Sequence, residues 1–368
     1  MKAGLKSLVI ALLSAGLFAC DRPAPKDAAP PAPGQPIIVA PAGEAPTSFS
    51  PIVKRVSPAV VSIDTLSVAQ NEDPFGDEGP EGLFAPPGAV PVRRGAGSGF
   101  IISADGYVVT NNHVVEGAQE IVVTLSDNRQ FPARLVGRDP PTDLAVLKIA
   151  VQGLPYVSFA RSALPEVGDW VVAVGNPFGL GGTATAGIVS ARGREIGESY
   201  VSYLQIDAPI NAGNSGGPSF DLEGRVVGVN TAIFSPTGGS VGIGFAIPAD
   251  LAETVTGQLI RNGRVTRGYL GVAARDLTPA LALRLGLSGR RGALIVGVAG
   301  GGPADGRLKP GDVVEAVGGK PVATAGAFTR SIAESAPGAE VSLRVLRGGR
   351  PLDISVKLAR RPDDAPGG

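Results

Sequence analysis

The chain of 368 residues has few of the side chains that build disulfides and multi-histidine metal sites. Its only cysteine, Cys20, has no partner for an intrachain disulfide, and its only histidine, His113, must carry any imidazole chemistry. It also has no glycine-rich phosphate loop ending in Lys-Ser/Thr, so we expect neither a metal nor a cofactor. The 33 basic and 33 acidic residues cancel, which argues against a general nucleic-acid or anionic-membrane binder. Aromatic residues make up only 5%, so the core must be rich in Val, Ile, Leu and Ala.

Residues 1–20 have the form of a bacterial secretion signal. Two lysines precede an apolar run at residues 7–19, which is too short to span a bilayer comfortably. The run ends in Leu-Phe-Ala-Cys, which resembles the lipobox where a bacterial lipoprotein is cleaved and acylated on its cysteine, here Cys20. Ordinary secretory cleavage is the alternative, although Leu17 is large for it. Asp21 resembles the signal that keeps lipoproteins in the inner membrane, so we expect a periplasmic protein attached to the membrane only by a lipid anchor.

Residues 21–51 are rich in proline and alanine and have no apolar periodicity, which predicts an extended tether. The next part of the chain contains short β-branched runs separated by turn signals, which predict strands. These runs are residues 58–66, 98–103, 107–110, 121–125, 131–136, 144–149, 170–174 and 225–230. Because no long helix intervenes, the pattern predicts an all-β barrel or sandwich.

The pattern changes at residues 248–263, which begin with a proline and end in an Asn-Gly pair. Apolar residues recur there every four positions: Leu251, Val255 and Leu259. This spacing predicts one amphipathic helix, which would connect two domains. Residues 266–360 then mix strands with short helices and predict a second small domain, and residues 361–368 form a polar tail.

Three short segments contain residue types that could carry catalysis. His113 follows an apolar strand run, in Thr-Asn-Asn-His-Val-Val-Glu. Asp143 directly precedes another apolar run, where a carboxylate would be partly desolvated, and Asp139 is a rival for the same role. Ser215 lies in the glycine-rich stretch at residues 210–218, whose backbone N–H groups could converge on one point. Taken one at a time, each residue has an ordinary structural explanation.

Together, the three residues have the chemistry of nucleophilic catalysis. A serine hydroxyl needs a base that takes its proton, and a carboxylate fixes the tautomer of an imidazole base. The carbonyl oxygen under attack becomes negative and needs fixed N–H donors, which a tight glycine turn can supply. The segment Gly-Asn-Ser-Gly-Gly also fits the Gly-x-Ser-x-Gly pattern of α/β-hydrolases, but those enzymes place histidine after serine, and no histidine follows Ser215. The order His113, Asp143, Ser215 is that of chymotrypsin-type double β-barrels.

Five segments closely resemble the HtrA/Deg (Do-like) family of trypsin-like serine proteases with a single C-terminal PDZ domain. They are residues 97–118, 139–149, 167–194, 206–218 and 239–248. The resemblance implies a mostly β fold, in which a chymotrypsin-like protease domain of two six-stranded β-barrels occupies residues 52–247. A connecting helix at residues 248–265 and a small α+β PDZ domain at residues 266–360 would follow.

The resemblance also assigns the residues of the site. It implies His113 as general base, Asp143 as the carboxylate that orients it, and Ser215 as nucleophile. The backbone N–H groups of Gly213 and Ser215 would form the oxyanion hole, with Asn214 shaping the turn. The residues that it places in the substrate pocket are Pro209, Ile210, Ile233 and Phe234. Because this pocket has no acidic residue at its floor, we expect cleavage after small or medium aliphatic residues rather than after Lys or Arg.

The second domain would bind the C-termini of peptides. Residues 267–272 resemble the carboxylate loop of this family's PDZ domains, and residues 301–322 resemble their core motif. The residues expected in the loop are Tyr269, Leu270, Gly271 and Val272. A PDZ domain adds the peptide as a strand at a sheet edge, while loop N–H groups hold the terminal carboxylate.

The family resemblance further implies a homotrimer formed through the protease domain. The acidic, Gly- and Pro-rich stretch at residues 70–95 would be a regulatory loop. Residues 193–201 occupy the segment where the family senses its PDZ domain or an activating peptide, and Arg192 and Arg194 are candidates for that coupling.

Two functions fit these residues. The first is an ATP-independent envelope serine endoprotease acting on unfolded or membrane proteins, either in broad quality control or by cutting one signalling protein in a stress response. The alternative is a peptide-binding chaperone or scaffold with little proteolysis. The intact set of His113, Asp143 and Ser215 favours the protease.

Overall fold

The computed structural model describes residues 46–68, 92–161, 164–176, 182–197, 200–235 and 239–362. The expected signal segment with Cys20, nearly all of the expected tether, most of the expected regulatory loop and the end of the polar tail lie outside these residues. Residues Ser48–Gly368 belong to one unit of the chain. No helix in the described ranges is long and apolar enough to cross a membrane.

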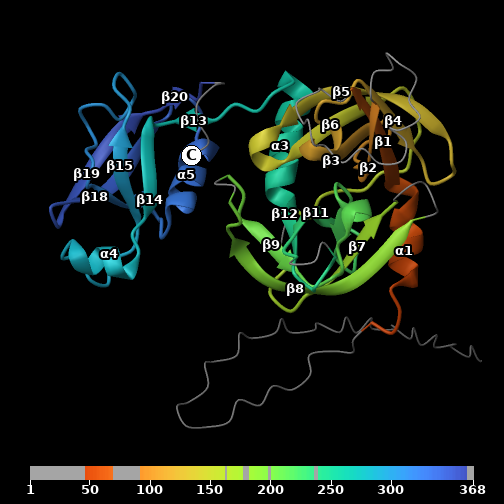
Figure 1. Ribbon diagram of the computed structural model, residues 1–368, viewed down its shortest axis with the longest axis horizontal. Helices are drawn as coiled ribbons and strands as arrows, with labels where there is room; N and C mark the ends of the chain where they lie inside the picture. Colours follow the sequence, from red (N-terminus) through yellow and green to blue (C-terminus); the bar gives the residue numbers. More distant parts are fainter. Residues whose placement is uncertain are drawn as a thin grey trace, which may run out of the picture. The chain divides into compact units, whose positions relative to one another are not determined.

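Six strands close the first barrel in the order β1-β2-β3-β6-β5-β4, after a short helix α1 (Ser50–Val56) (Figure 1). The strands are β1 (Val60–Val68), β2 (Val92–Ile101), β3 (Tyr107–Asn111), β4 (Glu120–Thr124), β5 (Gln130–Asp139) and β6 (Leu144–Ile149). Alternate residues of a strand face opposite sides of a sheet. Residues that face the interior of this barrel are therefore fully buried, such as Val61, Ile63, Val108 and Leu147.

Six further strands close the second barrel in the order β10-β11-β12-β9-β8-β7, which confirms the predicted double-barrel fold. They are β7 (Trp170–Gly175), β8 (Thr183–Arg194), β9 (Tyr203–Ile206), β10 (Pro218–Phe220), β11 (Val226–Ile233) and β12 (Gly244–Pro248). The β-branched runs predict only β7 and β11. Strand β8 is rich in Ala and Gly, and the other three are short, so pairing with neighbouring strands defines them.

One apolar cluster joins the two barrels. It contains Phe100 and Leu144 from the first barrel and Val174, Phe220 and Val229 from the second, and none of these side chains is more than 1% exposed. Burying a side chain of this size contributes roughly 1.5–3 kcal/mol. Helix α2 (Asn112–Val115) and the single turn η5 (Ala212–Asn214) lie at the ends of strands that meet at this seam. The seam therefore positions the segments that carry the predicted histidine and serine.

Helix α3 (Ala249–Asn262) follows β12 and packs against strands of both barrels. Of the residues that predict it, Val255 and Leu259 are buried and Leu251 is half-buried. The helix ends at Gly263, which adopts the left-handed conformation (φ 70°) and donates its N–H to the carbonyl oxygen of Leu259.

The C-terminal domain has a main sheet with strand order β14-β15-β16-β18-β19, in which β17 pairs with β16, and a small sheet of β13 and β20. The strands are β13 (Gly268–Tyr269), β14 (Val272–Asp276), β15 (Ala293–Val298), β16 (Val313–Val317), β17 (Lys320–Pro321), β18 (Glu340–Arg347), β19 (Arg350–Lys357) and β20 (Ala359–Arg360). Helices α4 (Pro279–Arg284) and α5 (Ala325–Glu334) begin after Thr278 and Thr324, whose hydroxyls cap them. Phe328 and Ile332 of α5 are buried in the core of the domain, and β14 remains at the edge of the main sheet.

Candidate active site

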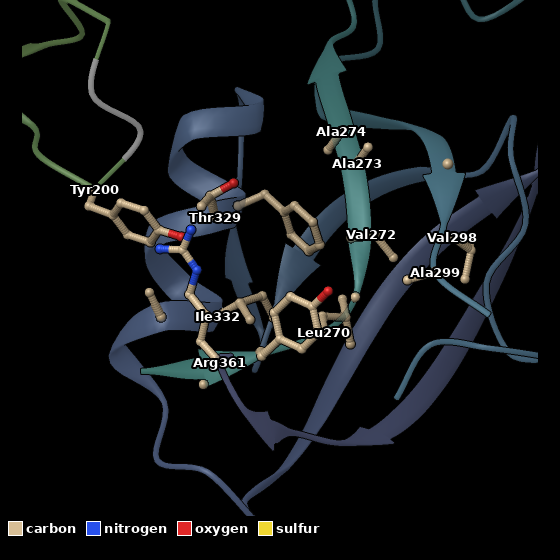
Figure 2. A pocket seen from close by; sticks show the side chains of 16 residues that line it. Tyr200, Leu270, Val272, Ala273, Ala274, Val298, Ala299, Thr329, Ile332 and Arg361 are labelled. Carbon is tan, nitrogen blue, oxygen red and sulfur yellow. The ribbon is translucent and has the colours of Figure 1, made fainter. Parts of the chain in front are cut away.

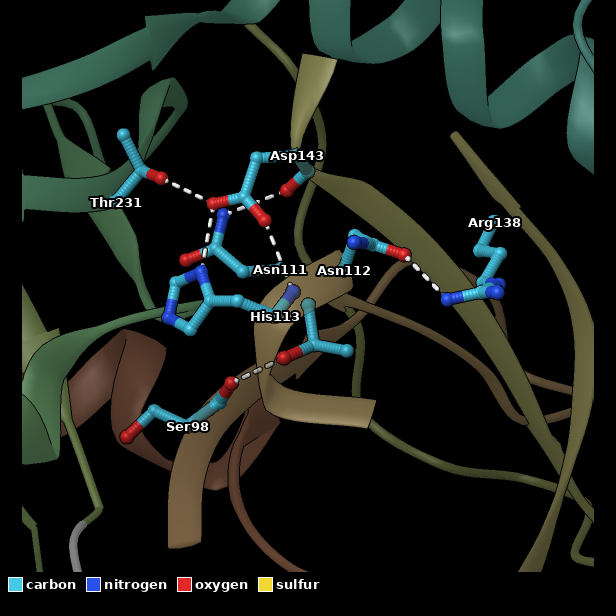
Figure 3. Close-up of polar contacts among 8 residues, drawn as sticks. Ser98, Asn111, Asn112, His113, Arg138, Asp143 and Thr231 are labelled. Atoms are coloured by element: carbon cyan, nitrogen blue, oxygen red, sulfur yellow. Dashed lines mark hydrogen bonds and ion pairs between the residues drawn. The ribbon is translucent and has the colours of Figure 1, made fainter. Parts of the chain in front are cut away.

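His113 lies on α2, directly after β3 of the first barrel, and its side chain is 47% exposed. Two contacts join it to Asp143 (Figure 3). The backbone N–H of His113 donates to Oδ1 at 2.9 Å, and Nδ1 of its ring lies 2.7 Å from Oδ2. Because an ionised carboxylate only accepts hydrogen bonds, this geometry favours the tautomer with the proton on Nδ1. The second ring nitrogen, Nε2, is then left able to accept a proton.

Asp143 adopts a left-handed backbone conformation (φ 54°, ψ 39°) directly after the turn η3 (Pro140–Thr142). This conformation costs a residue other than glycine on the order of 1 kcal/mol. Two hydrogen bonds to the carbonyl oxygen of Asp143 hold it, one from Asn112 N at 3.0 Å and one from Asn111 Nδ2 at 2.9 Å. The segment that leads into His113 therefore also fixes the residue that orients its ring.

A residue of the second barrel also donates a hydrogen bond to Asp143. Thr231, on β11, donates its hydroxyl to Oδ2 at 2.5 Å (Figure 3). No local feature of the sequence marks this residue, because it is a threonine inside an apolar strand run. The carboxylate is consequently held from both barrels, and its side chain is 19% exposed.

The rival carboxylate, Asp139, is engaged elsewhere. Its side chain is only 5% exposed, and Arg267 grips it with Nη1 on Oδ1 at 2.6 Å and Nη2 on Oδ2 at 2.5 Å. The hydroxyl of Thr142 also donates to Asp139. The structure therefore brings Asp143 to His113 and pairs Asp139 with an arginine at the start of the C-terminal domain.

Ser215 follows η5 in a turn that is wedged between the two barrels. Its carbonyl oxygen accepts from Ser98 N on β2 at 2.9 Å. The next residue, Gly216, donates its N–H to the carbonyl oxygen of Asn230 at 2.8 Å. Gly216 has φ 81°, and a Cβ there would lie 2.3 Å from Ser98 O and 3.1 Å from Asn111 N. Only glycine can therefore occupy this position, which lies against the segment leading to His113.

The backbone that precedes Ser215 has its own hydrogen bonds. Asn214 N donates to the carbonyl oxygen of Asn211 at 2.9 Å, and Asn214 Nδ2 donates to that of Pro209 at 3.2 Å. The carbonyl oxygen of Asn214 accepts from Gly217 N at 2.9 Å. These contacts fix peptide groups on either side of Ser215 in a tight turn, which is the arrangement that backbone donors for an oxyanion require.

The residues predicted to line the substrate pocket have unequal surroundings. Ile210 is 1% exposed and Ile233 is half-buried, and both belong to the apolar cluster inside the second barrel. Pro209 is exposed, and its carbonyl oxygen accepts from Thr185 Oγ1 as well as from Asn214. Phe234 is 60% exposed. An apolar wall is thus present at Ile210 and Ile233, while Phe234 lies largely in solvent.

The predicted carboxylate loop of the C-terminal domain borders a cavity of about 580 Å³ (Figure 2). The cavity lies between β14 and α5, with Leu270, Val272, Phe328 and Ile332 in its wall. Gly271 has φ 75°, and its carbonyl oxygen accepts from Ala299 N at 2.8 Å. The loop therefore lies next to β14, an edge strand of the main sheet, and next to this largely apolar cavity.

Contacts between the first domain and the C-terminal domain come from residues 193–201, the segment expected to couple them, through Glu195 and Tyr200. Arg194, which was a candidate for this coupling, donates to Gln205 within the second barrel. Its neighbour Glu195 accepts instead from Arg330 Nη2 at 2.7 Å and from Thr324 Oγ1 at 3.1 Å.

Tyr200 makes a second contact of this kind. Its ring lies 4.9 Å from the guanidinium carbon of Arg267 and 5.1 Å from that of Arg361. Burial raises the pKa of the Tyr200 phenol above its ordinary value, because it disfavours the charged phenolate.

Among the described residues, no group of His, Cys, Asp and Glu side chains could hold a metal ion. The contacts of His113 and of the Ser215 turn are compatible with the chemistry of an oriented imidazole next to a glycine-rich serine turn.

Residues 97–229 match the family described as a trypsin-like peptidase domain, and residues 268–358 match the PDZ domain family. Proteins named "Probable periplasmic serine endoprotease DegP-like" from Brucella suis biovar 1 (strain 1330) and Rhizobium meliloti (strain 1021) are 44% and 45% identical over 86% of this chain, and the matches cover 69% and 71% of those proteins. The solved structure of the HtrA-type protease AlgW with a tripeptide is 42% identical, with a TM-score of 0.73, over 86% of this chain and 98% of that one. The serine endoprotease from Yersinia pestis is 35% identical, with a TM-score of 0.62, over 87% of this chain and 100% of that one.

Proposed function

This chain belongs to the HtrA/Deg family of serine endoproteases with a PDZ domain, and we propose that it cleaves peptide bonds with His113, Asp143 and Ser215. The observation that carries the proposal is the pair of contacts from Asp143 to the backbone N–H and the ring Nδ1 of His113. These contacts leave Nε2 of the imidazole available as a base. The hydrogen bond from Ser98 N to Ser215 O, together with the closeness of Gly216 to the backbone of Asn111, supports a position of the imidazole next to the Ser215 turn.

In the proposed mechanism, Nε2 of His113 takes the proton of the Ser215 hydroxyl as its oxygen attacks the substrate carbonyl carbon. The carbonyl oxygen becomes an oxyanion, which the N–H groups of Gly213 and Ser215 stabilise. The tetrahedral adduct collapses to an acyl-enzyme when His113 gives the proton to the leaving amine. Water then hydrolyses the acyl-enzyme by the same route in reverse. No step consumes ATP.

Hydrolysis of casein by the full chain and by Ser215→Ala tests this assignment. We expect the substitution to lower the rate by more than about 10³-fold. Equal hydrolysis by both proteins would refute it. A wild-type chain that cleaves no casein but suppresses aggregation of an unfolded protein would support the alternative function, a peptide-binding chaperone.

We propose that the substrate pocket selects small or medium aliphatic side chains before the cleaved bond. The support is the apolar wall of Ile210 and Ile233, which offers no carboxylate to a basic side chain. A pair of fluorogenic peptides with Val or Arg at this position tests the proposal. Faster cleavage after Arg would contradict it.

The PDZ domain is proposed to bind the C-termini of substrates or activators, among them unfolded or membrane proteins. A peptide would extend the main sheet along β14, with its last side chain among Leu270, Phe328 and Ile332 and its carboxylate at the loop of residues 269–272. Fluorescence anisotropy with a labelled peptide tests this. Amidation of its C-terminus should weaken binding by at least about tenfold, because the loop N–H groups lose a charged acceptor. Equal affinity of the acid and the amide would contradict it.

We also propose a periplasmic location with a lipid anchor at Cys20, a role in quality control or stress signalling, and a homotrimer. The names of the relatives from Brucella suis and Rhizobium meliloti support the periplasm. For the trimer, the support is exposed apolar surface on the protease domain: Phe49 and Trp170 form an aromatic pair with centroids 5.4 Å apart, and Val167 is 62% exposed. Sedimentation of Trp170→Glu and of a control, Leu283→Glu in the PDZ domain, tests it. Only the first should give monomers.

A further inference from the structure

Ser98, which the sequence alone does not single out, makes two hydrogen bonds with the turn that contains Ser215. It lies on β2 and is fully buried. Its hydroxyl donates to the carbonyl oxygen of Gly213 at 2.6 Å, and its backbone N–H donates to that of Ser215 at 2.9 Å. The hydroxyl of Thr110 donates to the carbonyl oxygen of Ser98 itself at 2.8 Å. Strand β2 therefore grips the turn on both sides of Asn214.

These contacts act on peptide groups that set the proposed oxyanion donors. The hydroxyl of Ser98 holds the oxygen of the peptide group between Gly213 and Asn214, and Asn211 holds its N–H. The backbone N–H of Ser98 holds the oxygen of the group between Ser215 and Gly216. The group between these two carries the N–H of Ser215. The orientation of the Ser215 N–H, and that of the neighbouring Gly213 N–H, therefore depends on the two peptide groups whose oxygens Ser98 binds.

Glycine makes an external clamp necessary at this position. Gly213 has no Cβ, so its own φ and ψ angles are weakly restricted. Without the Ser98 hydroxyl, the peptide group between Gly213 and Asn214 would be held only through the N–H of Asn214. The φ and ψ angles of Gly213 could then change, and its own N–H, which belongs to the preceding peptide group, could change direction. A donor displaced by about 1 Å from the developing oxyanion loses most of its effect on the rate.

The same hydroxyl also receives a hydrogen bond. Asn176 N donates to Ser98 Oγ at 2.8 Å, and the side chain of Asn176 accepts from Gly182 N at 3.0 Å through Oδ1. The Ser98 hydroxyl is therefore both donor and acceptor, and it joins the serine turn to the end of β7. Alanine can make neither contact, and cysteine makes both weakly.

We infer that Ser98 is a positioning residue, whose buried hydroxyl holds the turn of Gly213 to Ser215 in the conformation that forms the oxyanion hole. This inference rests on the proposed function, because it takes Gly213 and Ser215 as the donors. It predicts that the hydroxyl contributes to stabilising the transition state and little to binding the substrate.

The chain offers a matched control in Ser62 on β1. Ser62 lies directly opposite Ser98 in the antiparallel ladder, so both side chains face the same side of the sheet. Both are fully buried, but the Ser62 hydroxyl has no hydrogen-bond partner among the described residues. Ser62→Ala removes the same atom at the same depth without removing a contact with the turn.

The test measures kcat and KM of Ser98→Ala and Ser62→Ala in the full chain with a fluorogenic peptide. For Ser98→Ala we expect kcat to fall about 10- to 100-fold, less than the loss of a whole oxyanion donor, with KM within about threefold of the wild type. A peptide boronic acid, whose adduct with serine places an oxygen in the oxyanion hole, should bind more weakly by a similar factor. The pH at which kcat/KM is half-maximal should not move, because His113 and Asp143 are untouched. Ser62→Ala should stay within about twofold of the wild type in every measurement.

Three results would overturn the inference. They are a wild-type kcat for Ser98→Ala, equal losses in Ser98→Ala and Ser62→Ala, and a loss that the unfolded fraction explains fully. If Ser98→Ala does not fold, Ser98→Cys replaces it, and a wild-type kcat in that variant would have the same meaning. Failure of the proposed function would be visible separately, as hydrolysis that survives Ser215→Ala.

Discussion

The buried pair of Arg267 and Asp139 yields a sharp prediction about stability. Its side chains are 10% and 5% exposed, and two hydrogen bonds of 2.6 and 2.5 Å join them. Removing one partner of such a pair leaves a buried charge without compensation, which costs about 3–5 kcal/mol. We therefore expect Arg267→Met to lower the free energy of unfolding of the protease domain by about that amount. Met preserves the unbranched side chain, so the loss reports mainly on the charge.

The second substitution separates charge from packing. Asp139→Asn in the Arg267→Met background removes the unpaired charge while the amide oxygen still accepts from Thr142. We expect the double variant to recover most of the lost free energy and to lie within about 2 kcal/mol of the wild type. Asp139 directly precedes η3, and Asp143 directly follows it. Arg267→Met should therefore also lower kcat/KM, and the double variant should restore part of it.

Urea unfolding followed by tryptophan fluorescence is the appropriate assay. The chain has a single tryptophan, Trp170, which lies on β7 of the second barrel, so its signal follows the protease domain. Unfolding of the PDZ domain alone would leave this signal largely unchanged. The reasoning would be refuted if Arg267→Met unfolded within about 1 kcal/mol of the wild type, or if the double variant were no more stable than Arg267→Met.

Three further predictions concern the site and its surroundings. Thr231→Val keeps the side-chain shape but removes a donor to Asp143, so kcat/KM should fall about tenfold with little change in melting temperature. An unchanged kcat/KM would contradict this role. Gly216→Ala should lower the free energy of unfolding by more than about 3 kcal/mol, because its Cβ would lie 2.3 Å from Ser98 O. Gly117→Ala, at a similar positive φ with nothing within 4 Å, should lower it by about 1 kcal/mol. Equal melting temperatures of the two variants would contradict the packing argument. Burial raises the pKa of Tyr200, so the folded chain binds this proton more tightly than the unfolded chain, and stability falls as the pH rises beyond about 10. Tyr200→Phe should show a shallower fall in melting temperature over that range, and an identical fall would show that other groups cause it.

The sequence pointed more directly to the proposed reacting groups than to the residues that support them. His113, Asp143 and Ser215 draw attention only together, because their side chains have complementary chemistry and because their order excludes the α/β-hydrolase arrangement. It left Asp139 open as an alternative to Asp143. The structure distinguishes them through Arg267, a partner far along the chain that no local pattern connects to Asp139.

The strands of the second barrel show the same limit. Strands β7 and β11 carry β-branched runs, but β8, β9, β10 and β12 do not, and they exist because neighbouring strands pair with them. The exposure of a side chain also depends on contacts that the local sequence does not show. Ile210 and Phe234 have the same predicted role, yet one is 1% exposed and the other 60% exposed, because only Ile210 faces the inside of the barrel.

Ser62 and Ser98 show why residues that support a site are recognised from their position in the sheet rather than from a sequence motif. Both are serines on neighbouring strands, both are fully buried, and they lie opposite each other in one antiparallel ladder. They differ only in what the second barrel brings next to them. At Ser98 this is the carbonyl oxygen of Gly213 and the N–H of Asn176, whereas at Ser62 no described donor or acceptor comes within reach. A buried hydroxyl without a partner lowers the stability of the fold, whereas a hydroxyl with two hydrogen bonds fixes the groups that it contacts. Loss of the oxygen should therefore have opposite effects at the two serines. Ser62→Ala should preserve or raise the melting temperature and keep the activity, and Ser98→Ala should lower kcat even where the fold survives.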